Sequence, residues 1–197
     1  MVTPPLDESI DLVEVLQDRP DLQLHAAIYR WAASRFETGW VIDLGSELGI
    51  GMTLMAQVNN QVKYIGMDSN LQIIKQASDI GLTKTRTIQA DGASLPIKSN
   101  VSSGVSMVNM LHLVEDPEAV LFEVRRILKP GGAVIISIPL EKLMDRWKPA
   151  TITKHLRQQA IGLFRNVHFY DKLTNPVTGL EWDDLSQQGI LLCVAEK

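Results

Sequence analysis

Residues 40–51 have the sequence WVIDLGSELGIG, and this stretch decides the fold. A short apolar run, Trp40–Leu44, passes directly into a loop with glycines at 45, 49 and 51, and residues 52–58 then favour a helix. A strand that turns through glycines into a helix is the opening unit of a parallel α/β sheet. The N–H groups at the start of such a helix have no partner within it, so they can bind a carboxylate or a phosphate.

The same alternation of strands and helices continues along the chain. We expect further strands at 62–67, 85–89, 105–110, 133–138, 167–170 and 190–195, and helices at 9–17, 20–36, 52–58, 70–80, 117–128 and 152–164. Continuous apolar strands between helices favour a parallel sheet covered on both faces, and right-handed crossovers make it doubly wound. The sequence therefore predicts an α/β fold with a doubly wound, mostly parallel seven-stranded sheet. We expect one domain over 1–197, with a tail and helices in 1–38 and the α/β core in 39–197.

Acidic residues follow three successive strands. Asp43, Asp68 and Asp91 are 25 and 23 residues apart, which is about one strand–helix unit each. Ligands of doubly wound sheets bind outside the carboxyl ends of the strands, where a carboxylate can accept both hydroxyls of a ribose or an adenine amino group. An aspartate after a strand is also a common helix cap. Because capping would need three separate coincidences, we favour ligand binding.

Composition excludes several other classes of protein. The 197 residues carry a net charge of −4 with Lys and Arg thinly spread, which argues against a nucleic-acid partner. The single cysteine, Cys193, forms neither an internal disulfide nor a cysteine-based metal cluster, as is typical of a reducing, cytoplasmic location. We expect no metal site, because the sequence shows no cluster of metal ligands. We expect no signal peptide, because the N-terminus has no basic stretch followed by an apolar core, and no membrane span, because no apolar run approaches ~18–20 residues.

Four motifs together resemble the class I S-adenosylmethionine-dependent methyltransferases, especially the small-molecule branch called methyltransferase type 11. VIDLGSELGIG (41–51) is similar to the acidic, glycine-rich first motif, YIGMDSN (64–70) to the second, and IQADGASLPIKSN (88–100) to the third. MLHLVEDPEAVLFEVRRILKPGG (110–132) is similar to the segment between the fourth strand and the turn before the fifth, and it is the most specific of the four. The resemblance extends from about Trp40 to Pro139.

The resemblance implies methyl transfer from S-adenosylmethionine to a small organic acceptor. It also implies a cofactor site at the ends of the first four strands, made by Asp43, Gly45, Ser46, Gly49, Gly51, Asp68, Ser69, Asp91, Gly92 and Asn109. A nicotinamide-dependent dehydrogenase is disfavoured, because its G-x-G-x-x-G motif would need glycine at 54, where Leu54 stands.

Methyl transfer is an in-line displacement that chiefly requires alignment of the reacting atoms and exclusion of water. A base is needed only if the acceptor must lose a proton. His112, after the fourth strand, is the candidate catalytic residue, with packing against the next helix as the alternative. His25, Tyr29 and Trp147 are candidates for the acceptor pocket, and for the first two the alternative is ordinary packing on the sheet. Four methionines are expected to fill the core: Met52, Met55, Met107 and Met110.

Glu47 departs from the family's pattern, because it stands where the first motif usually has glycine. An acid at this position would face the methionine carboxylate of the cofactor. In one alternative, Gly49 and Gly51 make the close approach in a loop two residues longer than usual. In another, the protein is a catalytically silent member of the fold that binds the cofactor or a protein partner. A second, lesser departure is Ser103-Gly104, where the family often has an aspartate.

Overall fold

The computed structural model describes residues 20–80, 86–140, 149–186 and 189–197. The helix expected at 9–17 and the pocket candidate Trp147 lie outside these residues. The helices are α2 (Pro20–Ala33), α3 (Ile50–Val58), α4 (Leu71–Ile80), α5 (Pro117–Ile127) and α6 (Pro149–Leu163). The strands are β1 (Gly39–Leu44), β2 (Val62–Asp68), β3 (Arg86–Gln89), β4 (Ser102–Val108), β5 (Leu128–Pro139), β6 (Arg165–Tyr170), β7 (Leu173–Thr174), β8 (Glu181–Trp182) and β9 (Ile190–Glu196).

The main sheet has seven strands in the order β3-β2-β1-β4-β5-β9-β6. The pairs from β3 to β5 are parallel, whereas β9 runs antiparallel to both β5 and β6. The strand order reverses between β1 and β4, which makes this the switch point of the sheet. The predicted doubly wound, mostly parallel seven-stranded sheet is therefore confirmed.

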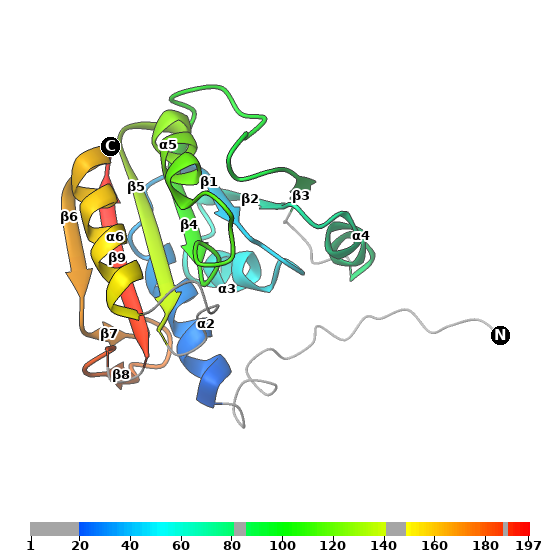
Figure 1. The fold of residues 1–197 in the computed structure, drawn as a ribbon. Helices are drawn as coiled ribbons and strands as arrows, with labels where there is room; N and C mark the ends of the chain where they lie inside the picture. Colours follow the sequence, from blue (N-terminus) through cyan, green and yellow to red (C-terminus); the bar gives the residue numbers. More distant parts are fainter. Residues whose placement is uncertain (1–19, 81–85, 141–148, 187–188) are drawn as a thin grey trace.

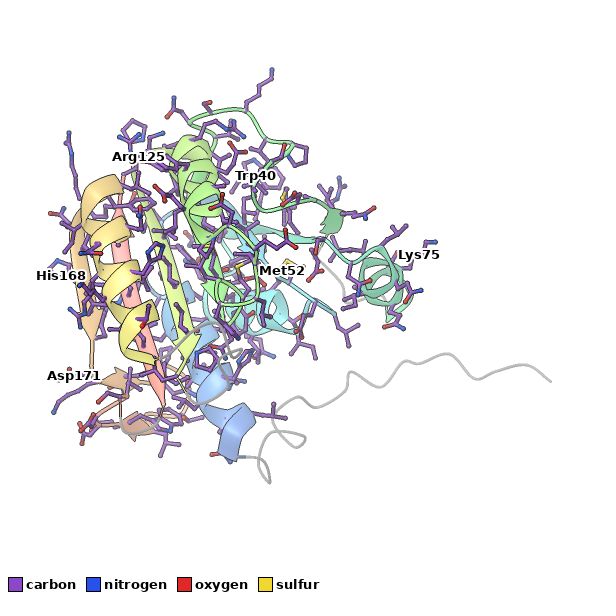
Figure 2. All side chains as sticks on the ribbon, in the orientation of Figure 1. Trp40, Met52, Lys75, Arg125, His168 and Asp171 are labelled. Atoms are coloured by element: carbon purple, nitrogen blue, oxygen red, sulfur yellow. The ribbon has the colours of Figure 1, made fainter. Side chains whose placement is uncertain are left out.

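Helices cover the sheet with two separate apolar clusters. One cluster contains the buried faces of α2 and α3, and the other contains those of α5 and α6, while α4 packs at the β2–β3 end of the sheet (Figure 1). Figure 2 shows Met52 of α3 in the middle of the molecule and Lys75 on the outer side of α4. None of the described helices combines the length and the apolar character that a membrane crossing requires.

Local sequence explains the position of α5. Asp116 caps the helix by accepting a hydrogen bond from Ala119 N at 3.0 Å, and Pro117 occupies its first turn. Val120, Val124 and Ile127 recur at helical spacing and are buried against the sheet.

Several predicted elements differ from the observed ones at their ends; for example, β4 is Ser102–Val108 where 105–110 was predicted, and α2 ends at Ala33 and not at 36. Two differences go further. The expected turn at Lys129–Gly132 is the start of β5, in which Gly131 has φ 79° and the pairing with β4 shifts register between Ser102 and Gly104. The β7–β8 hairpin was not predicted, because strands of two residues each are too short for an apolar alternation to show.

Candidate functional site

A pocket of about 500 Å³ lies at the carboxyl ends of β1, β2 and β4 and at the loop after β3. This volume is typical of small-molecule sites. Five of the ten residues expected at the cofactor line it: Gly45, Asp68, Ser69, Asp91 and Gly92. The rest of the lining is Leu44, Met67, Ala90, Ala93, Met110, Leu113, Val114, Glu115, Asp116 and Val120. The pocket thus brings the acidic ends of β2 and β3 to one cavity.

The loop after β1 is shaped by three residues with left-handed backbone. Gly45, Glu47 and Gly49 have φ of 73°, 45° and 83°. The N–H groups of Gly45 and Ser46 both donate to Met67 O, at 2.8 and 3.2 Å, so the loop folds back over the end of β2. A Cβ at Gly45 would lie 2.7 Å from the Cβ of Met110, closer than side chains can approach. Glycine at 45 therefore allows this loop to contact the segment after β4.

Glu47 lies on the outside of this loop. Its side chain is exposed and is not part of the pocket lining. Its backbone N–H donates to Asp68 Oδ2 at 3.2 Å. Residue 47 thus has the backbone conformation that glycine adopts most easily, and its exposed side chain is outside the pocket lining, although its charge contributes to raising the pKa of the buried Asp43.

Asp68 and Asp91 line the pocket, and their carboxylates also accept hydrogen bonds from backbone N–H groups. Asp68 Oδ1 accepts a hydrogen bond from Asn70 N at 2.9 Å, and Asp91 Oδ1 accepts one from Ala93 N at 2.9 Å. The side chain that caps α4 is Asn70, whose Oδ1 accepts from Gln72 N at 3.0 Å. An ionised carboxylate has about four acceptor positions, so both aspartates keep capacity for a ligand.

Asp43, in β1, and Ser46, in the loop that follows, are buried and lie outside the pocket lining. Ser106 Oγ donates to Asp43 Oδ1 at 2.6 Å, while Asp43 Oδ2 and Ser46 Oγ have no hydrogen-bond partner among the described residues. Burial raises the pKa of Asp43 to about 7, against the opposing effect of the Ser106 hydrogen bond. The Asp43 side chain is therefore bonded to β4 at the switch point of the sheet, two residues before the loop.

Gly51 contacts a helix rather than a ligand. It lies inside α3, and a Cβ there would be 2.3 Å from Cε1 and Cζ of Tyr29 on α2. Gly51 thus permits close packing of α2 on α3, so Tyr29 is a buried packing residue that contacts a helix, where the alternative prediction had it packed on the sheet. Burial raises the pKa of Tyr29 well above its usual value. Gly49 is the residue that precedes α3, at its N-cap.

His112 lies behind the pocket wall. It is 4% exposed, is absent from the lining, and its Nδ1 has no hydrogen-bond partner in the described part of the chain. Burial lowers the pKa of His112. A catalytic role for His112 stays a prediction that this placement does not favour. Asn109 and His25 lie outside the lining too, and are hydrogen-bonded to each other.

Sequence reasoning missed the part of the lining that follows β4. Met52, Met55 and Met107 are fully buried as expected, whereas Met110 is half-buried, packs against the core and also lines the pocket. The other missed residues lie within 113–120, inside the motif that carries the strongest family resemblance. That motif was the available signal.

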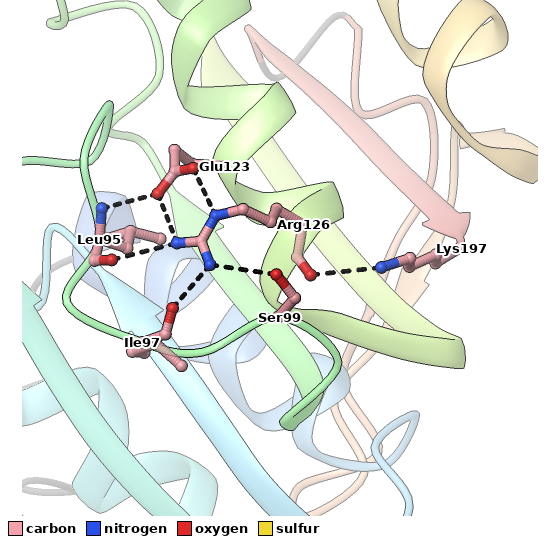
Figure 3. Close-up of polar contacts among 6 residues, drawn as sticks. All are labelled: Leu95, Ile97, Ser99, Glu123, Arg126 and Lys197. Carbon is pink, nitrogen blue, oxygen red and sulfur yellow. Dashed lines mark hydrogen bonds and ion pairs between the residues drawn. The ribbon is translucent and has the colours of Figure 1, made fainter.

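A pair of side chains on α5 anchors the loop after β3 (Figure 3). Arg126 donates to Ile97 O at 2.7 Å and to Leu95 O at 3.1 Å, and it is paired with Glu123 at 2.6 Å. Glu123 in turn accepts from Leu95 N at 2.8 Å. Because residues 92–99 contain no regular strand or helix, α5 supplies hydrogen-bond partners that a sheet would otherwise provide.

Known proteins share these features. Residues 42–136 match the family model described as a methyltransferase domain. This segment belongs to the methyltransferase domain family. The match covers β1 to β5, including every segment that lines the pocket.

Curated relatives and a solved structure agree with this assignment. A ubiquinone/menaquinone biosynthesis C-methyltransferase of Blochmanniella pennsylvanica is 31% identical over 87 residues, covering 44% of this chain and 32% of the relative. A malonyl-[acyl-carrier protein] O-methyltransferase of Alcanivorax borkumensis is 25% identical over 143 residues, covering 68% of this chain and 49% of the relative. The chain thus spans at most about half the length of these two relatives. A solved SAM-dependent methyltransferase from Thermotoga maritima shares the fold of this methyltransferase domain, with a TM-score of 0.61, 18% identity, and coverage of 88% and 89% of the two chains.

Proposed function

We propose that this protein transfers a methyl group from S-adenosylmethionine to a small organic acceptor. The observation that carries the proposal is that Asp68 and Asp91, from the ends of β2 and β3, line one pocket together with Gly45. The family match over 42–136 supports S-adenosylmethionine-dependent methylation in general. The net charge of −4 favours a small acceptor over a nucleic acid.

The residues present fit the cofactor. An adenosine offers a ribose diol and an amino group as donors, and the pocket offers the carboxylate acceptors Asp68 and Asp91. Met67, Met110 and Leu113 supply apolar surface for a base. Two residues before the loop, Asp43 Oδ2 is a buried polar atom without a partner among the described residues, as is expected near a bound polar group. When bound, S-adenosylmethionine supplies a methyl group activated on a sulfonium sulfur.

The chain's own contribution is binding and alignment. Asp68 would hold the ribose hydroxyls and Asp91 the adenine amino group, while the loop at 45–49 closes one side of the pocket. Among the described residues, no group of three or more His, Cys, Asp or Glu side chains is arranged to hold a metal ion. Glu47 and the lack of a convincing base are the two grounds for the alternative of a catalytically silent protein. The exposed side chain of Glu47, outside the pocket lining, weakens the first ground, and methyl transfer needs a base only if the acceptor must lose a proton.

Calorimetric titration with S-adenosylhomocysteine tests the proposal. We expect saturable binding and a higher melting temperature, since a ligand that binds only the native state stabilises it. Asp68→Ala should weaken binding at least about tenfold, the effect of losing roughly 1.4 kcal/mol of hydrogen bonding. Asp171→Ala, which removes an exposed carboxylate that lies outside the pocket lining, is the matched control. Absence of heat and of a thermal shift at millimolar ligand would refute the function, whereas unchanged affinity in Asp68→Ala would refute only the placement of the ribose.

A further inference from the structure

Lys197, directly after β9, has one hydrogen-bond acceptor for each proton of its ammonium group. Its Nζ donates to Asn100 Oδ1 at 2.7 Å, to Leu128 O at 2.8 Å and to Arg126 O at 3.2 Å, the last of which Figure 3 shows. A lysine ammonium has three donors and no acceptor, so these three oxygens match its full capacity. Lys197 therefore joins β9 to the end of α5 and to the loop after β3.

The C-terminal end of α5 is capped by segments that are distant in the sequence. Many helices end at a left-handed glycine, but α5 passes through Leu128, whose backbone is extended, directly into β5. The last carbonyls of a helix have no partner within it. In α5, Arg126 O accepts from Asn100 N at 3.1 Å, and the next carbonyl accepts from Val101 N at 2.8 Å. Lys197 adds further donors, and a cation is favourable at this end of a helix.

Arg126 connects this end of the helix to the wall of the pocket. Its carbonyl accepts from Lys197 and Asn100, while its guanidinium donates to two carbonyls earlier in the same loop. Asp91, at the start of that loop, lines the pocket. A shift of the end of α5 would therefore move two anchor points of the loop at once.

We propose that Lys197 is a positioning residue for the pocket, because it holds the carbonyl of Arg126 and the side chain of Asn100 and so orders the loop that carries Asp91. It acts from β9, a strand from which no described residue lines the pocket. The part of this inference that concerns ligand affinity rests on the proposed function, whereas the ordering of the loop does not.

Amide hydrogen exchange of Lys197→Met tests the ordering of the loop without any ligand. Methionine keeps an apolar stem but removes the three donors. We expect the amides of Leu95 and Asn100 to exchange at least about tenfold faster than in the native protein. Lys197→Arg should restore slow exchange, because a guanidinium also donates to carbonyl oxygens, and a failure to do so would contradict the role of the donors.

Lys98→Met is the matched control, since it removes an exposed lysine from the same loop and should leave the native exchange rates. The amide of Gly131, which donates to Lys197 O, reports on the end of β9 itself. If Lys197→Met sped up exchange at Gly131 alone, Lys197 would only secure its own strand, and the proposal would be wrong.

A second measurement needs no variant to fold. In the native protein, the ¹⁵N-labelled ammonium group of Lys197 should exchange its protons at least about tenfold more slowly than those of the exposed Lys75 and Lys154. Equal rates for the three ammonium groups would overturn the proposal, because they would mean that the bonds of Lys197 do not persist in solution.

Titration with S-adenosylhomocysteine then tests whether the ordering reaches the pocket. Lys197→Met should bind about threefold more weakly than the native protein, and Lys98→Met should bind equally well. Unchanged affinity in Lys197→Met would refute a positioning role for the pocket. If the native protein bound no ligand, the proposed function would fail, while the exchange measurements would still decide whether Lys197 orders the loop.

Discussion

Two walls of the pocket are held in different ways. The loop after β1 has left-handed backbone at Gly45, Glu47 and Gly49, and its own N–H groups donate to Met67 and Asp68 of the neighbouring strand β2. The loop after β3 has short-range bonds of its own, such as Ser94 N to Asp91 O, and is held by Glu123 and Arg126 of α5. The first wall thus depends on backbone conformation and on its bonds to a strand, and the second depends on the side chains of a helix about 30 residues away.

Because of this difference, substitutions in the two walls should affect the protein in different ways. Substitutions in the first wall act on backbone conformation and on the buried carboxylate beneath it. Substitutions in the second wall act on hydrogen bonds between a helix and a loop. They should make Asp91 and Gly92 more mobile, although neither residue is itself changed. Substitutions confined to one wall therefore measure the contribution of that wall alone.

We expect the largest effect on stability at Asp43, the buried residue of β1 that lies two positions before the first wall. Its pKa rises from 3.8 to about 7 on folding because of burial, so between these pH values the folded protein holds a proton that the unfolded chain has lost. Stability should therefore be highest below pH 4 for this group and fall as the pH rises to 7, by on the order of 4 kcal/mol at most. Urea unfolding of the native protein and of Asp43→Asn from pH 4 to 8 measures this contribution as the difference between the two curves.

Asp171→Asn is the control for Asp43, because it changes the net charge equally at an exposed position. Its stability should follow the native curve throughout. If the difference between native protein and Asp43→Asn did not vary with pH, Asp43 would share its burial with a cation or with water, and the first wall would not rest on a neutral acid.

The second wall is tested by Arg126→Gln. This change removes the donors to Leu95 O and Ile97 O and leaves Glu123 without its cationic partner. We expect a loss of about 2–3 kcal/mol, since hydrogen bonds to charged groups are worth more than neutral ones, with some reduction because the Arg126 side chain is 35% exposed. Hydrogen exchange should also show reduced protection of the Leu95 amide. Affinity for S-adenosylhomocysteine should fall with it.

Arg125→Gln is the matched control on the same helix. Arg125 makes one hydrogen bond, to Leu163 O at 2.7 Å, on the side toward α6. This variant should lose at most about 1 kcal/mol and leave the protection of Leu95 unchanged. Equal effects of the two variants on ligand affinity would mean that α5 supports the fold in general and not the wall.

The contrast between the walls also explains what could be predicted from the sequence. Strands, glycines and the aspartates after β2 and β3 leave local signals, and the structure has Asp68 and Asp91 in one pocket. The hydrogen bonds from Glu123 and Arg126 to the loop after β3 leave no local sequence signal, because they depend on which loop passes over α5. The place of Met110 in the pocket wall could not be predicted for the same reason, since an apolar residue after a strand suits a core and a pocket wall equally well, and Met110 contacts both.

Packing contacts between neighbouring elements are the other feature that could not be predicted from the sequence. Sequence spacing could not show that Tyr29 fills the space above Gly51, or that Gly66 makes room for Ser46, whose Oγ would lie 2.5 Å from a Cβ at residue 66. These contacts come from the packing of α2, α3 and β2. A glycine in an apolar strand signals close approach of another chain segment, but it does not identify the segment.

The smallest expected effect is that of Glu47→Gly in the first wall. Residue 47 has φ 45°, where a side chain costs about 1 kcal/mol relative to glycine, while the added freedom of glycine in the unfolded chain costs ~0.4–1 kcal/mol. The two terms nearly cancel, so stability should change by less than about 1 kcal/mol. Affinity for S-adenosylhomocysteine should change less than about threefold, because the Glu47 side chain is exposed and outside the lining. Gly45→Ala, at φ 73° and with its Cβ 2.7 Å from Met110 Cβ, should in contrast destabilise by about 2 kcal/mol or more. Much tighter binding by Glu47→Gly would mean that the glutamate obstructs the ligand, and that the first wall moves when a ligand binds.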